Sequence, residues 1–172
     1  MRYILLFTVL IFSACSSQPE KAQVSAYADL KGFFESEAMR LQNANPEIIK
    51  SVARNNASET KIQKGIDWKT ELSLFTESDI NKPAWKDSYK VISRPGNTTY
   101  LSADSNLRTI EINLSRDVNG KIRKVNILNR SQNILYSTTE RLVYIPDSVY
   151  QISKQQHVVF LGDNHYQIKG LF

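Results

Sequence analysis

Apolar and polar side chains alternate one by one through most of the chain after Tyr89, and short turn sequences interrupt this alternation. In residues 107–115, LRTIEINLS, each isoleucine or leucine of the second half is followed by a polar residue, which is the period of a β-strand with one buried face. Asn119 and Gly120 separate this run from the next one, residues 121–129, and an Asn-Gly pair between alternating runs is a strong hairpin signal. The pattern predicts a meander of seven or eight antiparallel strands.

Two further turns are predicted in the second half of this meander. Pro146–Asp147 and Asp163–Asn164 combine residues that favour turns with flanking alternating segments. Phe172, the last residue, continues the alternation and resembles the final residue of outer-membrane β-barrel strands. The length would fit an eight-stranded barrel, but short strands interrupted by charged residues and two preceding helices make this a minor alternative.

Helical periodicity is confined to the part of the chain before Tyr89. Apolar residues recur at steps of three and four over residues 26–42, which predicts an amphipathic helix. Asp67 can cap a second helix that begins at Trp68 and ends near Ser78. Between them, residues 46–65 alternate on both sides of an Asn-Asn pair, which favours a hairpin, with a helix over residues 46–55 as the alternative.

These elements together predict one α+β domain over residues 26–172. Two amphipathic helices are expected to pack on a long, curled, half-barrel-like antiparallel meander, because one face of such a sheet must be covered. The outline resembles the carriers and outer-membrane receptors of bacterial lipoproteins, in which helices plug a half-barrel that accepts acyl chains. That resemblance depends on the order of the elements and on the lipid anchor described below, and it implies an apolar or acyl ligand.

The N-terminal segment has the organisation of a signal peptide. Residues 3–12 are an apolar run of ten, about half of the length that a helix needs to cross a bilayer. Ser13 and Ala14 are small, and Cys15, the only cysteine of the chain, follows them. An alternative is an ordinary secreted protein that is cleaved after Ser16.

The sequence around Cys15 resembles the lipobox of bacterial lipoproteins, with Phe12 at a position where the family usually has an aliphatic residue. The resemblance implies that residues 1–14 are removed and that Cys15 carries fatty acyl chains such as palmitate. Residues 15–25 would then be a lipidated cysteine and a flexible tether. Because Ser16 follows the cysteine instead of Asp, the resemblance also implies the outer membrane, and we expect the domain to face the periplasm.

Charge argues against nucleic acid as a partner. Without residues 1–14, which contain only Arg2 among the charged residues, the chain has 22 − 1 = 21 basic and 17 acidic residues, a net charge of +4. These basic residues are spread among acidic ones and do not form the basic cluster that nucleic-acid surfaces show. The expected partners are therefore the membrane, through Cys15, an acyl or lipid ligand, and a protein of the envelope.

The sequence predicts no cofactor, no metal site and no enzymatic activity. His157 and His165 lack neighbours at metal-ligand spacing, although Asp163 could contact His165. The best candidate contact for a partner or ligand is the loop over residues 77–89, where Asp79 and Asp87 flank Trp85. A non-enzymatic module that binds an apolar or acyl ligand is expected, with an interaction subunit of an envelope complex as the alternative.

Overall fold

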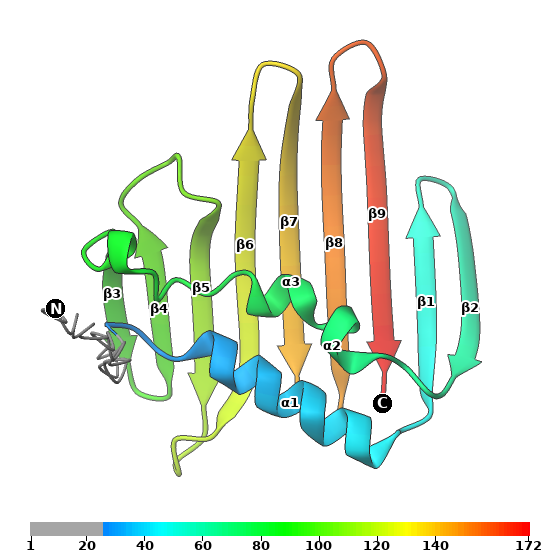
Figure 1. Ribbon diagram of the computed structural model, residues 1–172, viewed down its shortest axis with the longest axis horizontal. Helices are drawn as coiled ribbons and strands as arrows, with labels where there is room; N and C mark the ends of the chain where they lie inside the picture. Colours follow the sequence, from blue (N-terminus) through cyan, green and yellow to red (C-terminus); the bar gives the residue numbers. More distant parts are fainter. Residues whose placement is uncertain (1–25) are drawn as a thin grey trace, which may run out of the picture.

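The computed structural model describes residues 26–172, which form a single antiparallel β-sheet of nine strands with helices on one of its faces (Figure 1). The strand order across the sheet is β2-β1-β9-β8-β7-β6-β5-β4-β3. The sheet is open, with β2 and β3 as its edges. The protein is therefore mostly β, which confirms the predicted antiparallel meander with helices in its coarse form.

The strands follow the chain as a meander, except that the first hairpin joins the sheet beside the last strand. The sheet contains β1 (Ile48–Arg54), β2 (Ala57–Gln63), β3 (Tyr89–Arg94), β4 (Asn97–Ser102), β5 (Thr109–Arg116), β6 (Ile122–Gln132), β7 (Tyr136–Ile145), β8 (Val149–Val158) and β9 (Gly162–Leu171). The predicted hairpin within residues 46–65 is confirmed as β1 and β2. Its left-handed turn residue is Asn55, with a φ of 52°.

The helices lie across the lower part of the sheet, and the turns of the two long hairpins, β6–β7 and β8–β9, lie beyond them (Figure 1). They are α1 (Leu30–Ala44), α2 (Trp68–Glu71), α3 (Ser73–Thr76) and the 3-10 helix η1 (Pro83–Trp85). The first helix begins at Leu30, four residues later than the predicted 26–42, because the Asp29 side chain accepts a hydrogen bond from Gly32 N and caps it. Asp67 caps α2 as predicted, but the second helix is interrupted at Leu72.

The core lies between the helices and the sheet and consists largely of aromatic rings. Phe34 of α1 packs 4.8 Å from Phe75 and 5.2 Å from Tyr144 of β7, measured between ring centroids, and all three are fully buried. Trp68 stacks on Phe172 with centroids 5.4 Å apart. Since aromatic side chains bury large areas, this layer holds helices and sheet together.

The predicted position of the turn between the last two strands, Asp163–Asn164, is wrong. Asp163 and Asn164 belong to β9, and the chain reverses earlier, at residues 159–161, so that Val158 pairs with Gly162. Phe160 and Gly162 have φ values of 69° and 80°, and these left-handed conformations form the turn. The predicted turn at Pro146–Asp147 is present, with Asp147 at a φ of 55°.

Candidate functional site

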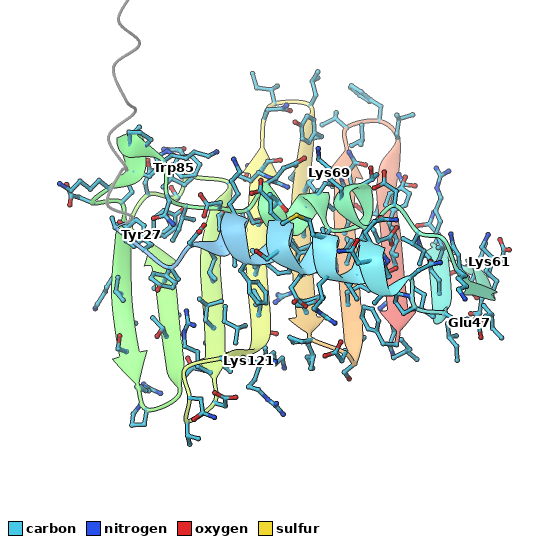
Figure 2. The ribbon with its side chains drawn as sticks, turned by 60° about the horizontal axis from the view of Figure 1, so that its bottom comes forward. Tyr27, Glu47, Lys61, Lys69, Trp85 and Lys121 are labelled. Carbon is cyan, nitrogen blue, oxygen red and sulfur yellow. The ribbon has the colours of Figure 1, made fainter. Side chains whose placement is uncertain are left out.

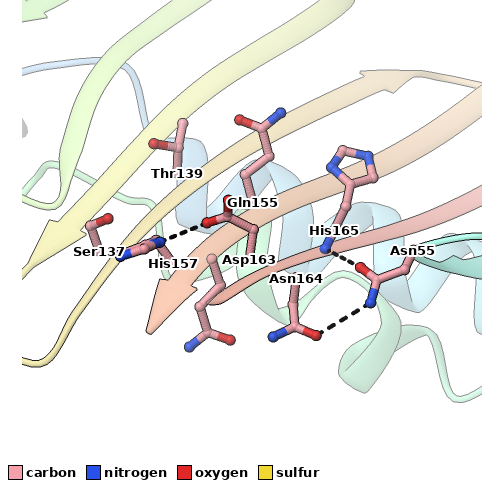
Figure 3. Close-up of a pocket in the computed structure, with 9 residues that line it drawn as sticks. Asn55, Ser137, Thr139, Gln155, His157, Asp163, Asn164 and His165 are labelled. Atoms are coloured by element: carbon pink, nitrogen blue, oxygen red, sulfur yellow. Dashed lines mark hydrogen bonds and ion pairs between the residues drawn. The ribbon is translucent and has the colours of Figure 1, made fainter. Parts of the chain in front are cut away.

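A polar pocket lies on the sheet face away from the helices, close to the turns of the two long hairpins (Figure 3). Leu142 and Tyr144 point from β7 into the core, so that the residues alternating with them, including Thr139, point to the opposite face. The pocket has a volume of about 450 Å³ and is lined by hydrogen-bonding side chains. These include Ser137, Thr139, Gln155, His157, Asp163 and His165.

A histidine–carboxylate pair lies in this pocket. His157 of β8 and Asp163 of β9 are cross-strand partners, and their Nδ1 and Oδ1 atoms are 2.7 Å apart. The contact that the sequence suggested, between Asp163 and His165, is replaced by this one because the turn lies before Asp163. The side chains are 57% and 86% exposed, so the pair is open to solvent. Such a pair is suited to hydrogen bonding with a polar ligand, whereas a proton-transfer site is usually desolvated.

The turn between β1 and β2 forms one wall of the pocket. Asn55 N donates to the carbonyl oxygen of His165 at 2.7 Å, and Asn55 Oδ1 accepts from His165 N at 2.8 Å. The amide of Asn55 also contacts Asn164 Oδ1 at 3.4 Å. Sequence reasoning identified Asn55 only as a turn residue. Its role in the site depends on the pairing of β1 with β9, for which the local sequence carries no signal.

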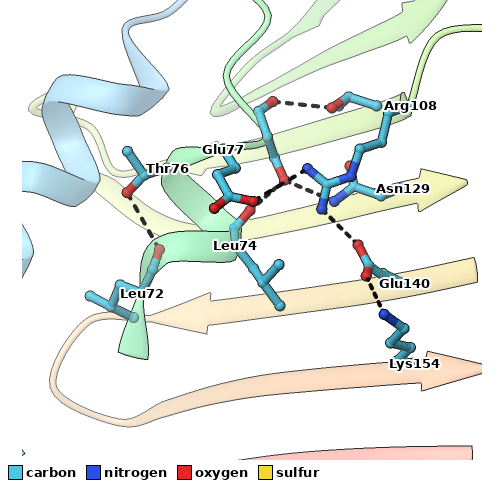
Figure 4. A network of polar contacts seen from close by, with 10 residues as sticks. Leu72, Leu74, Thr76, Glu77, Arg108, Asn129, Glu140 and Lys154 are labelled. Carbon is cyan, nitrogen blue, oxygen red and sulfur yellow. Dashed lines mark hydrogen bonds and ion pairs between the residues drawn. The ribbon is translucent and has the colours of Figure 1, made fainter. Parts of the chain in front are cut away.

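The opposite face of the same strands is fixed by a charged cluster (Figure 4). Glu140 of β7 is 6% exposed and accepts a hydrogen bond from Arg108 Nη2 at 2.8 Å, while Lys154 Nζ of β8 lies 3.4 Å from its other oxygen. Asn129 of β6 donates to Ser78 Oγ at 2.8 Å, and its Oδ1 accepts no hydrogen bond among the described residues. Arg108 and Lys154 neutralise Glu140 from two sides, and the Lys154 contact joins β8 to β7. The contact between Asn129 and Ser78 joins β6 to the loop after α3.

The predicted contact loop lies at the β3 edge of the sheet and not at the pocket. Trp85 is half-buried in η1, packs against the core and carries Lys82 Nζ 4.1 Å above its ring. Tyr27 O–H donates to the carbonyl oxygens of Lys86 at 2.6 Å and Trp85 at 3.1 Å. This loop therefore holds the beginning of the described chain against the sheet (Figure 2).

The two predicted carboxylates of this loop differ in their surroundings. Asp79 is partly buried and accepts a hydrogen bond from Asn81 N at 3.1 Å, while Asp87 is exposed. The Asn81 side chain in turn donates to the carbonyl oxygen of Ala28 at 2.9 Å. Asp79 thus organises the turn that holds the chain before α1. The predicted lipid attachment at Cys15 lies outside the described residues.

Within residues 26–172, no group of three or more His, Cys, Asp or Glu is arranged to hold a metal ion. None of the helices in this range is long and apolar enough to cross a bilayer. Comparison with protein-family models, with curated proteins and with solved structures finds no match.

Proposed function

We propose that this protein is a lipid-anchored lipoprotein of the bacterial outer membrane, and that it acts without catalysis as an interaction module of the cell envelope. Cys15 is the proposed attachment point of the lipid, and the domain faces the periplasm. The partner binds on the open face of the sheet, with the pocket beside the β6–β7 and β8–β9 hairpins as the centre of the contact.

The observation that carries this proposal is the difference between the two faces of the sheet. On the helix face, Phe34, Phe75 and Tyr144 fill the space between the layers and are fully buried. On the other face, three neighbouring strands present a pocket of hydrogen-bonding side chains to solvent. Polar groups that converge in a concave surface are what a ligand or partner site requires.

The competing proposal is an acyl ligand held between the helices and a half-barrel-like sheet. An acyl chain in that layer would have to displace aromatic rings that contact one another, and filling a packed core without moving its side chains is not possible. The packing therefore supports the interaction module over the acyl carrier.

Mass spectrometry under native conditions distinguishes these two proposals. The protein is purified from its host without delipidation and is measured intact. We expect a mature chain that begins at Cys15 and carries covalent acyl chains, with no further lipid bound in stoichiometric amount. A non-covalent lipid that is lost when Phe34→Trp crowds the core would support the acyl carrier, and an unmodified Cys15 would contradict the anchor.

Photo-crosslinking tests the pocket itself. A photoreactive amino acid replaces Gln155 at the pocket, or, as the matched control, Glu35 on the exposed side of α1, and cells are irradiated. We expect one defined adduct at position 155 that is absent at position 35 and is lost when Thr139→Arg fills the pocket. Equal adducts at both positions, or an adduct that survives Thr139→Arg, would exclude the pocket as the contact.

A further inference from the structure

Six apolar side chains are exposed at the turns of the two long hairpins. Ile134 is 94% exposed, Phe160 100% and Leu161 80%, and the other members of this group are Leu135, Tyr136 and Val159. We call these six residues the apolar tip. A contiguous exposed apolar surface on a folded domain marks a place where another apolar phase or partner binds. No acidic or basic residue occurs in 134–136 or 159–161.

The two turns form one unit at the same end of the sheet. Val159 N of the β8–β9 turn donates to the carbonyl oxygen of Leu135 in the β6–β7 turn at 2.9 Å. In Figure 1 both turns project beyond the helices, at the top of the view. The apolar tip is therefore a protrusion and not part of the layer that packs under α1.

The backbone of the apolar tip has few free hydrogen-bond donors. Leu135 N and Tyr136 N both donate to Asn133 Oδ1, at 2.8 and 2.9 Å, and Leu161 N donates to the carbonyl oxygen of Val158 at 3.1 Å. Unpaired backbone donors are what excludes most turns from a lipid phase, because each one costs several kcal/mol there. Because most backbone N–H groups of the apolar tip are already paired, the free-energy cost of moving these turns into lipid is small.

We propose that the apolar tip inserts into the interfacial region of a lipid bilayer. Insertion would place the residues one to four positions below the tip, about 3–13 Å along the strands, at the depth of the headgroups. The pocket residues Thr139 and Gln155 lie in this zone, so the partner of the pocket would be bound at the membrane surface. Arg130 pairs with Thr139 in this zone, and Lys154 pairs with Glu140 at its lower limit. Arg54, which pairs with Tyr166 of β9, lies level with Lys154. Arg130 and Arg54 favour anionic headgroups, whereas Lys154 is held by Glu140 and Asp163 offsets part of the positive charge.

The position of the apolar tip agrees with a membrane tether at Cys15, so this inference depends in part on the proposed function. Tyr27 contacts Tyr89 at the start of β3, and the register across the sheet places Tyr89 level with about Glu140. Tyr136, at the start of β7, lies four residues nearer the apolar tip than Glu140, a distance of about 13 Å along the strand. Across the sheet, β8 is five strand spacings of about 4.8 Å away from β3. The twelve residue-to-residue steps from Cys15 to Tyr27 can span up to about 40 Å. Tether and apolar tip can therefore reach the same bilayer.

The experiment removes the tether and asks whether the apolar tip alone binds lipid. Since Cys15 is the only cysteine, Cys15→Ser in the chain from residue 15 onward gives a thiol-free protein. Phe160→Cys in this protein is labelled with a polarity-sensitive fluorophore and mixed with vesicles of phosphatidylethanolamine and phosphatidylglycerol. Val118→Cys is the matched control, because Val118 is 101% exposed in the β5–β6 turn at the opposite end of the sheet. We expect a blue shift of the emission at position 160 and none at position 118.

Partitioning into the same vesicles gives the second measurement. Phe160→Asn, Leu161→Ser and Ile134→Ser should each lower the partition coefficient by about tenfold, and Val118→Ser should leave it unchanged. Absence of binding by the Cys15→Ser protein, equal effects of Val118→Ser and Leu161→Ser, or a dimer in solution that Leu161→Ser dissociates would each overturn the proposal. The acyl chains on Cys15 are tested separately by intact mass, so a failed anchor and a failed tip give different results.

Discussion

Phe160 has a backbone conformation that its side chain disfavours. Its φ of 69° lies in the left-handed region, where a bulky residue is strained by about 1–2 kcal/mol and Asn is accommodated more easily. Phe160→Asn should therefore raise the free energy of unfolding by about 1 kcal/mol, measured by urea denaturation. Leu161→Asn, at a neighbouring position without a positive φ, should bring no gain. A lower stability of Phe160→Asn would show that the aromatic ring has a packing role.

Gly170 is required because an aromatic ring covers it. It pairs with Tyr150 across β8 and β9, and a Cβ at position 170 would overlap the ring of Tyr150. Tyr150 is fully buried, and its O–H donates to Glu71 Oε1 at 2.6 Å, so the ring has little freedom to move.

The substitution Gly170→Ala should therefore lower the free energy of unfolding by about 1–3 kcal/mol, the usual range for overpacking. Thermal or urea denaturation measures the change. In a Tyr150→Leu background the same substitution should have a smaller effect, because the overlapping ring is gone. Equal effects in both backgrounds would place the cause in the backbone of β9.

At the scale of the elements, α1 is joined to the sheet by an ionised hydrogen-bond cluster. Tyr144 O–H of β7 donates to Glu37 Oε2 at 2.6 Å, and Arg40 forms a two-point contact with the same carboxylate at 2.9 Å. Burial alone would raise the pKa of Glu37, but the hydrogen bonds from Arg40 and Tyr144 outweigh it and hold this pKa below its ordinary value of 4.5. Burial, together with the bond to Glu37, raises the pKa of Tyr144.

This shift predicts how stability depends on pH. Because the pKa of Glu37 is lowered in the folded state, its stabilising contribution is complete above about pH 4.5 and is lost as the pH falls below that value. The free energy of unfolding of Glu37→Gln should therefore decline less steeply than that of the wild type between pH 5 and pH 3, measured by urea titrations at each pH. Glu35→Gln is the control, since Glu35 forms an exposed pair with Lys31 at 3.8 Å. Parallel pH profiles for Glu37→Gln and the wild type would contradict the assignment.

The elements that sequence reasoning identified were those with a local signal. The Asn119–Gly120 turn, the cap at Asp67 and the hairpin around Asn55 were recognisable because turn and cap residues act on their neighbours. The pocket was not recognisable, because a turn predicted at Asp163 placed that residue in a loop. With the turn at residues 159–161, Asp163 pairs with His157, so an error of a few residues in one turn hid the site.

For the whole molecule, the feature that local sequence could not predict is the pairing of the first strand of the chain, β1, with the last strand, β9. The last strand, β9, lies between β1 and β8, and its pairing with β1 joins residues more than a hundred positions apart, such as Val52 and Ile168. Beyond β9, the ring of Phe172 stacks on Trp68 of α2. Removing the ring of Phe172 should therefore lower the stability of the helices, the first hairpin and the meander together.

Phe172→Ala tests this coupling. Loss of the stacked, half-buried ring should lower the free energy of unfolding by about 1–3 kcal/mol, less than for a fully buried phenylalanine. In the wild type, Trp fluorescence, which reports partly on Trp68, and circular dichroism of the sheet should give the same urea midpoint, because one core joins all elements. Phe172→Ala should shift both midpoints equally. A fluorescence midpoint that falls while the sheet signal stays in place would show that the helices and the first hairpin separate from the meander, and that β9 does not couple the two ends.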